Sequence, residues 1–215
     1  MALQSGCTAV TITDVDSGRV TYALENGFAT HGYVVPTSPY SRVSSGTSTP
    51  SDGIMTPLST YSTVGDKLDI AKAIAADLLA VTKPEFGAPE EDEDDGVDVT
   101  FECTGKEPCM QTALYATRPG GKVIMVGMGT PIQTVPLSAA HLREVDILGI
   151  FRYSNTYKTG IRLLSRMGKP GGLPVLDAMV THRFKGLDKA GEAFEIAGRT
   201  VDRDGKLVLK VVIEA

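Results

Sequence analysis

Four segments of the chain place polar or glycine residues directly after a short apolar run, where they could meet a ligand. They are Asp14, Cys103-Thr104-Gly105, Gly127-Met128-Gly129 and Phe151-Arg152-Tyr153. In open α/β sheets, ligands bind beyond the carboxyl ends of the parallel strands. If the apolar runs are such strands, these are the positions at which a binding site is expected.

Asp14 ends the first of these runs, Val10 to Thr13. A carboxylate at this point can accept hydrogen bonds from both hydroxyls of an adenosine ribose and repels a 2′-phosphate, so the pattern favours NAD over NADP. Arg19, further along the same segment, could cover the adenine or approach the ribose. Taken alone, the acid is equally well explained by a favourable charge at the N-terminus of a following helix.

A dinucleotide site also needs a glycine-rich phosphate loop about 20 residues before that acid. Only thirteen residues precede Asp14, and the later stretch GMGTPI lacks the third glycine of such a loop. The spacing therefore predicts that the phosphate loop belongs before Met1.

Two of the other strand ends could contact a ligand. Gly127 and Gly129 let the backbone approach a flat ring, although a simple turn explains these glycines slightly better. Arg152 ends a strongly apolar run beside an aromatic residue, where it could bind an anion or a polyol oxygen. Stacking of the guanidinium on the aromatic ring is the competing explanation.

The search for metal ligands and nucleophiles is mostly negative. The chain has three histidines, which are far apart and have no partner at ligand spacing, and three cysteines, which form neither an even disulfide set nor a CxxC pair. These residues are His31, His141, His182, Cys7, Cys103 and Cys109. The histidines are expected at the surface or at caps, and no metal site or catalytic residue is predicted within the chain.

Composition narrows the class of partner. The 215-residue chain has a net charge of −5, which gives no basic surface for nucleic acid, and no apolar stretch is long enough for a membrane span. The first residues, MALQSGCTAV, do not resemble a signal peptide. These features predict a cytoplasmic protein that binds a small molecule, and neither nucleic acid nor a membrane.

Apolar patterning predicts alternating strands and helices. Strands are expected over 10–13, 33–35, 97–101, 122–127, 147–151 and 207–213, and helices over 17–25, 66–80, 108–117, 161–167 and 190–197. The clearest strand, KVIMVG, is apolar without alternation, as expected when helices cover both faces of a parallel sheet. The alternation predicts an α/β fold with a doubly wound, Rossmann-like parallel sheet.

Two stretches interrupt this alternation. Residues 37–63 are rich in Ser, Thr, Pro and Gly and have too few apolar side chains to offset the entropy of ordering, which predicts a flexible insertion. Residues 84–96 contain an acidic run from Glu90 to Asp95 and are expected to form a solvated loop. The folded domain is therefore predicted over 1–36 and 64–215.

Taken together, the strand-end peptides resemble the C-terminal cofactor half of the medium-chain zinc-dependent dehydrogenases. The similar branch is that of the sorbitol, xylitol and L-arabinitol dehydrogenases, fungal ones in particular. The peptides are TDVDSGR, FECTG, YATRPGGKVIMVGMG, REVDILGIFRYSNTY and VTHRFKGLDKAGEAF. The resemblance extends over the whole chain apart from the insertion and the acidic run.

The resemblance implies roles for individual residues. Those implied to contact NAD are Asp14 and Arg19 at the ribose, and Val126, Gly127, Met128, Ile150, Phe151 and Arg152 along the nicotinamide. Arg152 and Tyr153 are implied to lie near a polyol substrate. The resemblance also implies a homo-oligomer formed through this domain. Zinc would be bound by a cysteine, a histidine and a glutamate of a catalytic half that comes before this region.

That catalytic half, the first strand and the phosphate loop have no counterpart in this sequence. The resemblance therefore predicts an incomplete NAD-binding domain, truncated at its N-terminus and without activity of its own. The first candidate function is hydride transfer from a sorbitol-, xylitol- or arabinitol-like polyol to NAD, represented here by a truncated chain. The second is a non-catalytic oligomerisation or nucleotide-binding remnant. Zinc-free reductases of the same superfamily fit the REVDILGIFRY region less well.

Overall fold

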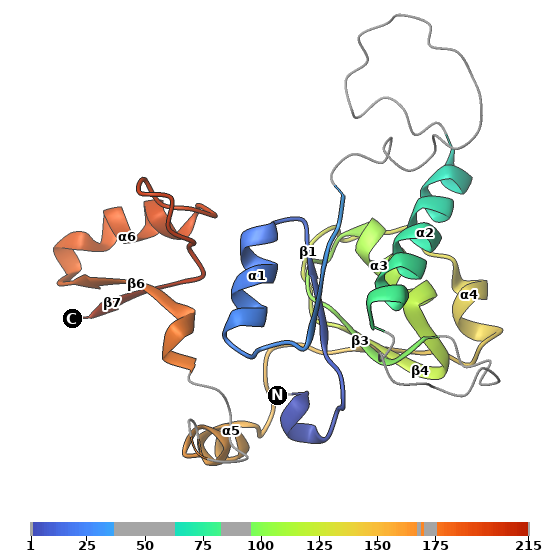
Figure 1. Cartoon of the computed structure of the whole chain (residues 1–215), viewed down its shortest axis with the longest axis horizontal. Coiled ribbons are helices and arrows are strands. Elements are labelled where there is room, and N and C mark those ends of the chain that lie inside the picture. The colour runs from blue at the N-terminus through green and yellow to red at the C-terminus, as the bar shows by residue number, and fades with distance from the viewer. Residues whose placement is uncertain (1, 37–62, 83–95, 167–168, 170–175, 215) are drawn as a thin grey trace, which may run out of the picture. The chain divides into compact units, whose positions relative to one another are not determined.

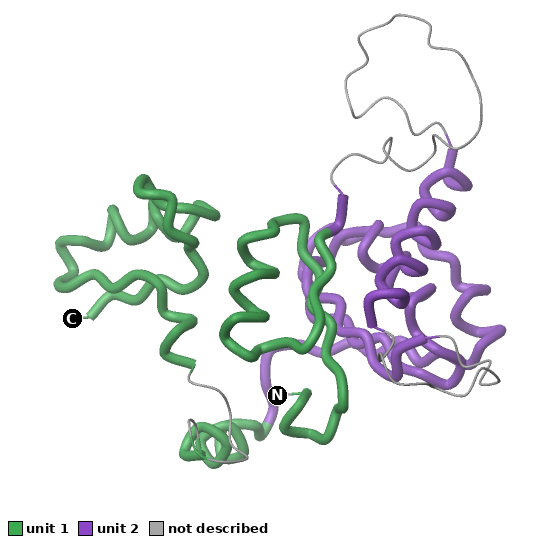
Figure 2. The backbone as a smooth tube through the Cα atoms, in the orientation of Figure 1, with its two compact units in different colours: residues 1–34, 155–215 green, residues 35–154 purple. Residues whose placement is uncertain are grey.

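The computed structural model describes residues 2–36, 63–82, 96–166, 169 and 176–214. The chain divides into two compact units, Met1–Val34 with Asn155–Ala215 (unit 1) and Val35–Ser154 (unit 2) (Figure 2). The predicted insertion over 37–63 and the predicted acidic loop over 84–96 lie outside the described residues, except for Thr63 and Gly96. No helix among the described residues is both long enough and apolar enough to cross a lipid bilayer.

Unit 1 begins with a strand–helix–strand segment (Figure 1). β1 (Thr11–Asp14) and β2 (His31–Val34) pair in parallel, with Thr11 opposite His31, and α1 (Ser17–Glu25) connects them. α1 buries Val20 and Ala23, one turn apart, and Gly32 of β2 lies directly under it. A Cβ at Gly32 would be 2.5 Å from a methyl carbon of Val20, so a glycine is needed for this close packing.

The rest of unit 1 contains a second parallel pair of strands. Its elements are η1 (Leu3–Ser5), α5 (Tyr157–Leu164), η3 (Leu176–Met179), β6 (Val180–Lys185), η4 (Leu187–Lys189), α6 (Ala190–Ala197) and β7 (Lys210–Glu214). β6 pairs with β7, and α6 lies between them in the chain and packs on β7.

Unit 2 is a three-stranded parallel sheet in the order β3–β4–β5, with its helices grouped to one side in Figure 1. Its elements are α2 (Val64–Thr82), β3 (Val97–Glu102), α3 (Glu107–Ala116), β4 (Thr117–Met125), α4 (Leu137–His141) and β5 (Asp146–Gly149). The core lies between α3, α4 and the sheet. It consists of Met110, Ala113, Leu114, Val123, Ala140 and Val145, with Met125, Val135 and Ile147 packed against it.

The named strands form three separate sheets, β1–β2, β3–β4–β5 and β6–β7. Every pairing between the named strands is parallel, and helices connect most consecutive strands. The predicted α/β class is therefore confirmed.

The structure corrects several predicted boundaries. The helix over 17–25 has the predicted ends, but the strand predicted over 122–127 ends at Met125 and the one over 147–151 ends at Gly149. β4 also begins earlier, at Thr117, because the Pro119-Gly120-Gly121 turn is accommodated as an irregularity in the pairing with β3. The helix predicted over 161–167 spans Tyr157–Leu164, and β6 and α4 are absent from the prediction.

Candidate cofactor site

Asp14 is the last residue of β1, and its carboxylate closes the turn into α1. Its Oδ1 accepts a hydrogen bond from the backbone N–H of Asp16 at 2.9 Å, and its Oδ2 lies 3.6 Å from a guanidinium nitrogen of Arg19. Asp16 is the N-cap of α1 and accepts a hydrogen bond from the Arg19 N–H at 3.1 Å. Asp16 is thus the N-cap of α1, and the Asp14 carboxylate lies just before it, where its charge also favours the helix N-terminus.

This turn retains hydrogen-bonding capacity for a ligand. The side chains of Asp14 and Arg19 are 28% and 37% exposed. The Nε of Arg19 is enclosed, and no described residue accepts a hydrogen bond from it. A ribose hydroxyl can donate a hydrogen bond, so the partly exposed Asp14 carboxylate could accept one there.

The glycines of the Gly127-Met128-Gly129 segment are explained by backbone packing. A Cβ at Gly127 would lie 2.0 Å from the backbone nitrogen of Gly105, and one at Gly129 would lie 2.3 Å from the Gly105 carbonyl oxygen. Gly105 itself has φ +69°, which favours glycine. Close packing against Thr104-Gly105 thus accounts for these glycines without a ligand.

Glu102, at the end of β3, lies beside this glycine segment and is a residue that the sequence analysis missed. It is 5% exposed, and its carboxylate accepts hydrogen bonds from the N–H groups of Thr104 and Gly105. Its position before Cys-Thr-Gly at a strand end was visible in the sequence. The burial of the Glu102 side chain could not be predicted, because a glutamate at a strand end usually faces solvent.

The apolar residues predicted to lie along the nicotinamide come together at the ends of β4 and β5. Met125 pairs with Gly149, and the N–H of Ile150 donates to the Met125 carbonyl at 3.3 Å. Val126 and Ile150 therefore follow neighbouring strand ends. Their side chains, with those of Met128 and Phe151, are exposed, as a face for a flat ring requires. Asp14 and Arg19 belong to unit 1, whereas these residues belong to unit 2.

Arg152 adopts a left-handed backbone conformation with φ +55°. Its guanidinium carbon lies 5.2 Å from the centroid of the Phe151 ring, which supports the stacking explanation offered for it. The adjacent Tyr153 is largely exposed. A non-glycine residue at positive φ is uncommon and often occurs at functional positions, so the conformation is compatible with a binding role as well.

The described residues contain no group of three or more His, Cys, Asp or Glu side chains that could hold a metal ion, so they do not fit a zinc site. Cys7, Cys103 and Cys109 are free thiols. Burial, together with the neighbouring Glu102 carboxylate, raises the pKa of the Cys103 thiol. A thiol with a raised pKa is a poor nucleophile at neutral pH.

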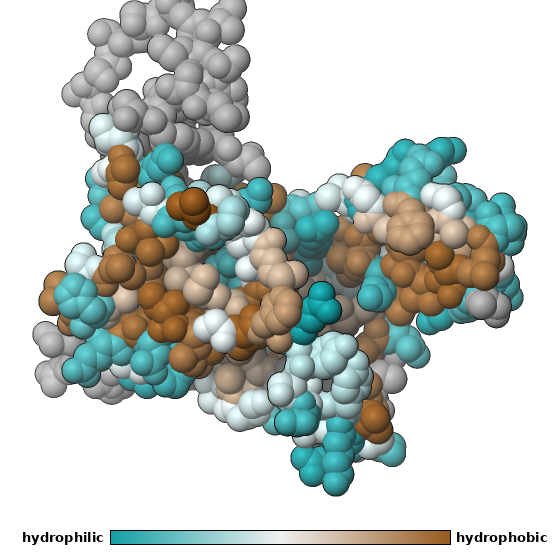
Figure 3. All heavy atoms as spheres, turned by 180° about the vertical axis from the view of Figure 1, so that it is seen from behind, coloured by the Kyte–Doolittle hydropathy of each residue, from teal (hydrophilic) through white to brown (hydrophobic). Residues whose placement is uncertain are grey.

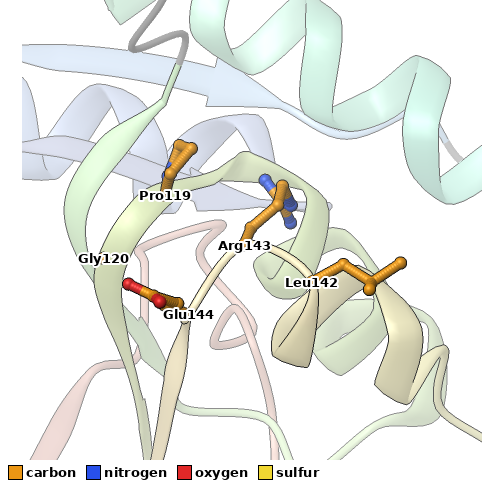
Figure 4. A pocket seen from close by; sticks show the side chains of 5 residues that line it. All are labelled: Pro119, Gly120, Leu142, Arg143 and Glu144. Carbon is orange, nitrogen blue, oxygen red and sulfur yellow. The ribbon is translucent and has the colours of Figure 1, made fainter.

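A shallow pocket of about 410 Å³ lies elsewhere in unit 2 (Figure 4). It is lined by Pro119, Gly120, Leu142, Arg143 and Glu144. The Arg143 guanidinium is occupied by the carbonyls of Ala139 and Thr117, both at 2.8 Å, and of Leu114. Because the Arg143 guanidinium already donates to these backbone carbonyls, it is not available to bind a ligand in this pocket.

Parallel strands with connecting helices define an α/β protein with a Rossmann-like fold. Among solved structures, 2R,3R-butanediol dehydrogenase from Bacillus subtilis matches the whole chain with a TM-score of 0.62 and 17% identity, over 46% of its own chain. A putative zinc-binding dehydrogenase from Sinorhizobium meliloti 1021 bound to NADP matches with a TM-score of 0.61 and 19% identity, over 100% of this chain and 47% of its own. A short chain alcohol dehydrogenase from Escherichia coli CFT073, complexed with NADH, matches 97% of this chain and 45% of its own, with a TM-score of 0.58 and 14% identity. These likenesses establish the fold.

The family follows from the sequence. The family model for zinc-binding dehydrogenases matches residues 1–166, so the chain belongs to that family. Human sorbitol dehydrogenase is 44% identical over 137 residues, which are 60% of this chain and 36% of the relative. L-idonate 5-dehydrogenase from Vitis vinifera is 50% identical over 105 residues, 48% of this chain and 27% of the relative. The chain thus spans about a third of the length of these relatives. The predicted membership in the sorbitol dehydrogenase branch of this family is confirmed.

Proposed function

We propose that this chain is the cofactor-binding part of an NAD-dependent polyol or secondary-alcohol dehydrogenase. Its similarity to sorbitol and L-idonate dehydrogenases supports a polyol as the substrate class. The nicotinamide of NAD, when bound, accepts the hydride that leaves the carbinol carbon. The residues of this chain would bind and orient that cofactor and exclude water from it.

One observation carries the proposal: Asp14 ends a parallel strand and keeps a partly exposed carboxylate beside Arg19. Asp14 and Arg19 would hold the adenosine ribose, and the carboxylate disfavours a 2′-phosphate. The exposed face formed by Val126, Met128 and Ile150 would contact the nicotinamide ring. Arg152 and Tyr153 would border the polyol.

No step of the reaction is assigned to zinc, because the described residues offer no ligand set for it. We therefore propose that the chain alone does not oxidise alcohols. Turnover of sorbitol or xylitol with NAD by the purified chain would contradict this part of the proposal. We further propose that the protein is cytoplasmic and that it forms a homo-oligomer.

The cofactor site is tested by titrating the purified chain with NADH and following the nicotinamide fluorescence. Asp14→Ala is expected to weaken NADH binding by about ten- to a hundredfold, because a hydrogen bond to a charged group contributes about 1.5–3 kcal/mol. NADPH should bind the unmodified chain more weakly than NADH. Asp188→Ala removes an exposed carboxylate from the same unit and serves as the control. Equal NADH affinity of Asp14→Ala and Asp188→Ala would refute the assignment of Asp14.

A non-catalytic oligomerisation or nucleotide-binding remnant is the second candidate. Exposed apolar side chains of unit 2 favour association (Figure 3). Absence of NADH binding by a folded, self-associating chain would favour oligomerisation alone over the first proposal.

A further inference from the structure

Glu102 is a buried carboxylate that is held by neutral donors. Its Oε1 accepts hydrogen bonds from the Thr104 N–H at 2.8 Å and from the Thr104 hydroxyl. Its Oε2 accepts one from the Gly105 N–H at 2.9 Å, and Oε1 lies 3.1 Å from the same nitrogen. Within the described residues, no Lys, Arg or His side chain pairs with it. A buried charge in this setting requires all of these donors, so the turn that carries them is tightly fixed.

The 102–105 turn also positions the segment that follows β4. The backbone carbonyl of Glu102 accepts hydrogen bonds from the N–H groups of Val126 at 2.8 Å and Gly127 at 2.9 Å. The Gly105 carbonyl accepts hydrogen bonds from the Thr130 N–H at 2.9 Å and the Gln133 side-chain amide at 3.0 Å. Both ends of the 126–130 segment therefore depend on the 102–105 turn.

The contact between the two segments leaves no room for adjustment. A Cβ at Gly105 would lie 2.0 Å from the backbone nitrogen of Gly129, and a Cβ at Gly127 would lie 2.6 Å from the Thr104 carbonyl carbon. A shift of the Thr104-Gly105 turn must consequently displace Gly127 and Gly129 as well.

We propose that Glu102 is a positioning residue for the cofactor: its carboxylate fixes the Thr104-Gly105 turn, and that turn sets the backbone of Val126 to Met128. This inference rests on the proposed function, in which Val126 to Met128 lie along the nicotinamide. Glu102 does not itself touch the cofactor and acts through the neighbouring backbone.

Glu102→Gln tests the inference. A glutamine has one acceptor oxygen, and its NH₂ group would face the N–H donors of the turn, so at least one hydrogen bond is lost. We expect faster amide hydrogen exchange in 104–105 and 126–130 and an NADH dissociation constant about tenfold higher, equivalent to about 1.4 kcal/mol. Glu144→Gln removes an exposed carboxylate from the same unit and should change neither quantity.

A further pair of variants separates positioning from a general loss of structure. Thr104→Val removes the hydroxyl donor and should raise the NADH dissociation constant, whereas Thr104→Ser keeps the hydroxyl and should restore it. The Thr104 pair also decides the matter if Glu102→Gln does not fold.

The outcomes distinguish this inference from the proposed function. If the unmodified chain binds no NADH, the proposed function is overturned and this inference with it. If the chain binds NADH and Glu102→Gln loosens the 126–130 segment without weakening NADH binding, the inference alone is overturned and Glu102 is merely structural. The inference is also overturned if Glu102→Gln changes neither the amide hydrogen exchange of residues 126–130 nor the NADH dissociation constant.

Discussion

At the scale of single residues, His182 and Asp202 form a pair that the sequence analysis did not anticipate. His182 was expected at the surface or at a cap. Its Nε2 lies 3.0 Å from Asp202 Oδ2, and the two side chains are only 12% and 14% exposed. Asp202 Oδ1 also accepts hydrogen bonds from the backbone N–H groups of Asp204 at 2.9 Å and Lys206 at 2.7 Å. One carboxylate thus ties β6 to the turn that precedes β7.

This pair predicts a pH dependence of stability in unit 1. The hydrogen bond from His182, followed by the one from the Lys206 N–H, lowers the pKa of Asp202 below its ordinary value. A lowered folded-state pKa means that the carboxylate stabilises the fold above the unfolded-state value of about 3.9, and that this stabilisation is lost as pH falls through the folded-state pKa. Asp202→Asn should therefore lower the Tm most at neutral pH.

Thermal melts of the unmodified chain and Asp202→Asn from pH 3 to 7 measure this effect. The difference in Tm should shrink toward the acid end, where Asp202 is protonated in the unmodified chain too. A difference that stays constant over this range would show that the charge of Asp202 contributes nothing.

At the scale of elements, the contact between the β3–α3 turn and the segment after β4 depends on glycine. Gly127→Ala would place a Cβ 2.0 Å from the Gly105 nitrogen and should destabilise unit 2 by about 1–3 kcal/mol, as overpacking does. Gly149→Ala is the matched control, because a Cβ there meets nothing within 4 Å and φ is not positive. Urea unfolding measures both, and equal stability of the two variants would contradict this packing.

Arg143 holds three elements of unit 2 together. It donates to carbonyls of Leu114 in α3, Thr117 in β4 and Ala139 in α4. Arg143→Ala leaves these acceptors without their charged donor and should lower the free energy of unfolding by about 2 kcal/mol. Lys122→Ala loses only an exposed ion pair with Asp146 at 2.7 Å, for which less than about 1 kcal/mol is expected in the same urea titration. A comparable loss in both variants would refute the bridging role of Arg143.

Much of the element layout is predictable from local patterns, and much of the site is not. The helix over 17–25 follows from Val20 and Leu24 on one face and from the Asn26-Gly27 stop, and Asp14 follows from its place after an apolar strand. The burial of Glu102 depends on donors from a turn, and the start of β4 depends on how Pro119-Gly120-Gly121 fits the pairing with β3. Such tertiary hydrogen bonds and register shifts leave no periodic signal in a sequence.

At the scale of the whole molecule, one face of the β3–β4–β5 sheet retains an apolar row. Phe101 lies opposite Ile124, and Ile124 lies opposite Leu148, so the three share one face. Phe101 is 57% and Leu148 41% exposed. The helical face instead buries Val123 and packs Ile147. Parallel sheets are normally covered on both faces, so this row needs a cover in solution.

We therefore expect the chain to self-associate through this face. Leu148→Lys places a charge in the row, away from the α3 core, and should shift the chain toward the monomer in size-exclusion chromatography with light scattering. Burying an ammonium group without a partner is strongly unfavourable, and this opposes association. Leu142→Lys is the control: it also replaces an exposed leucine with a lysine, but at the end of α4 and outside the row. It should leave the mass distribution unchanged. Identical mass distributions for Leu148→Lys and the unmodified chain across a concentration series would exclude this face as the interface.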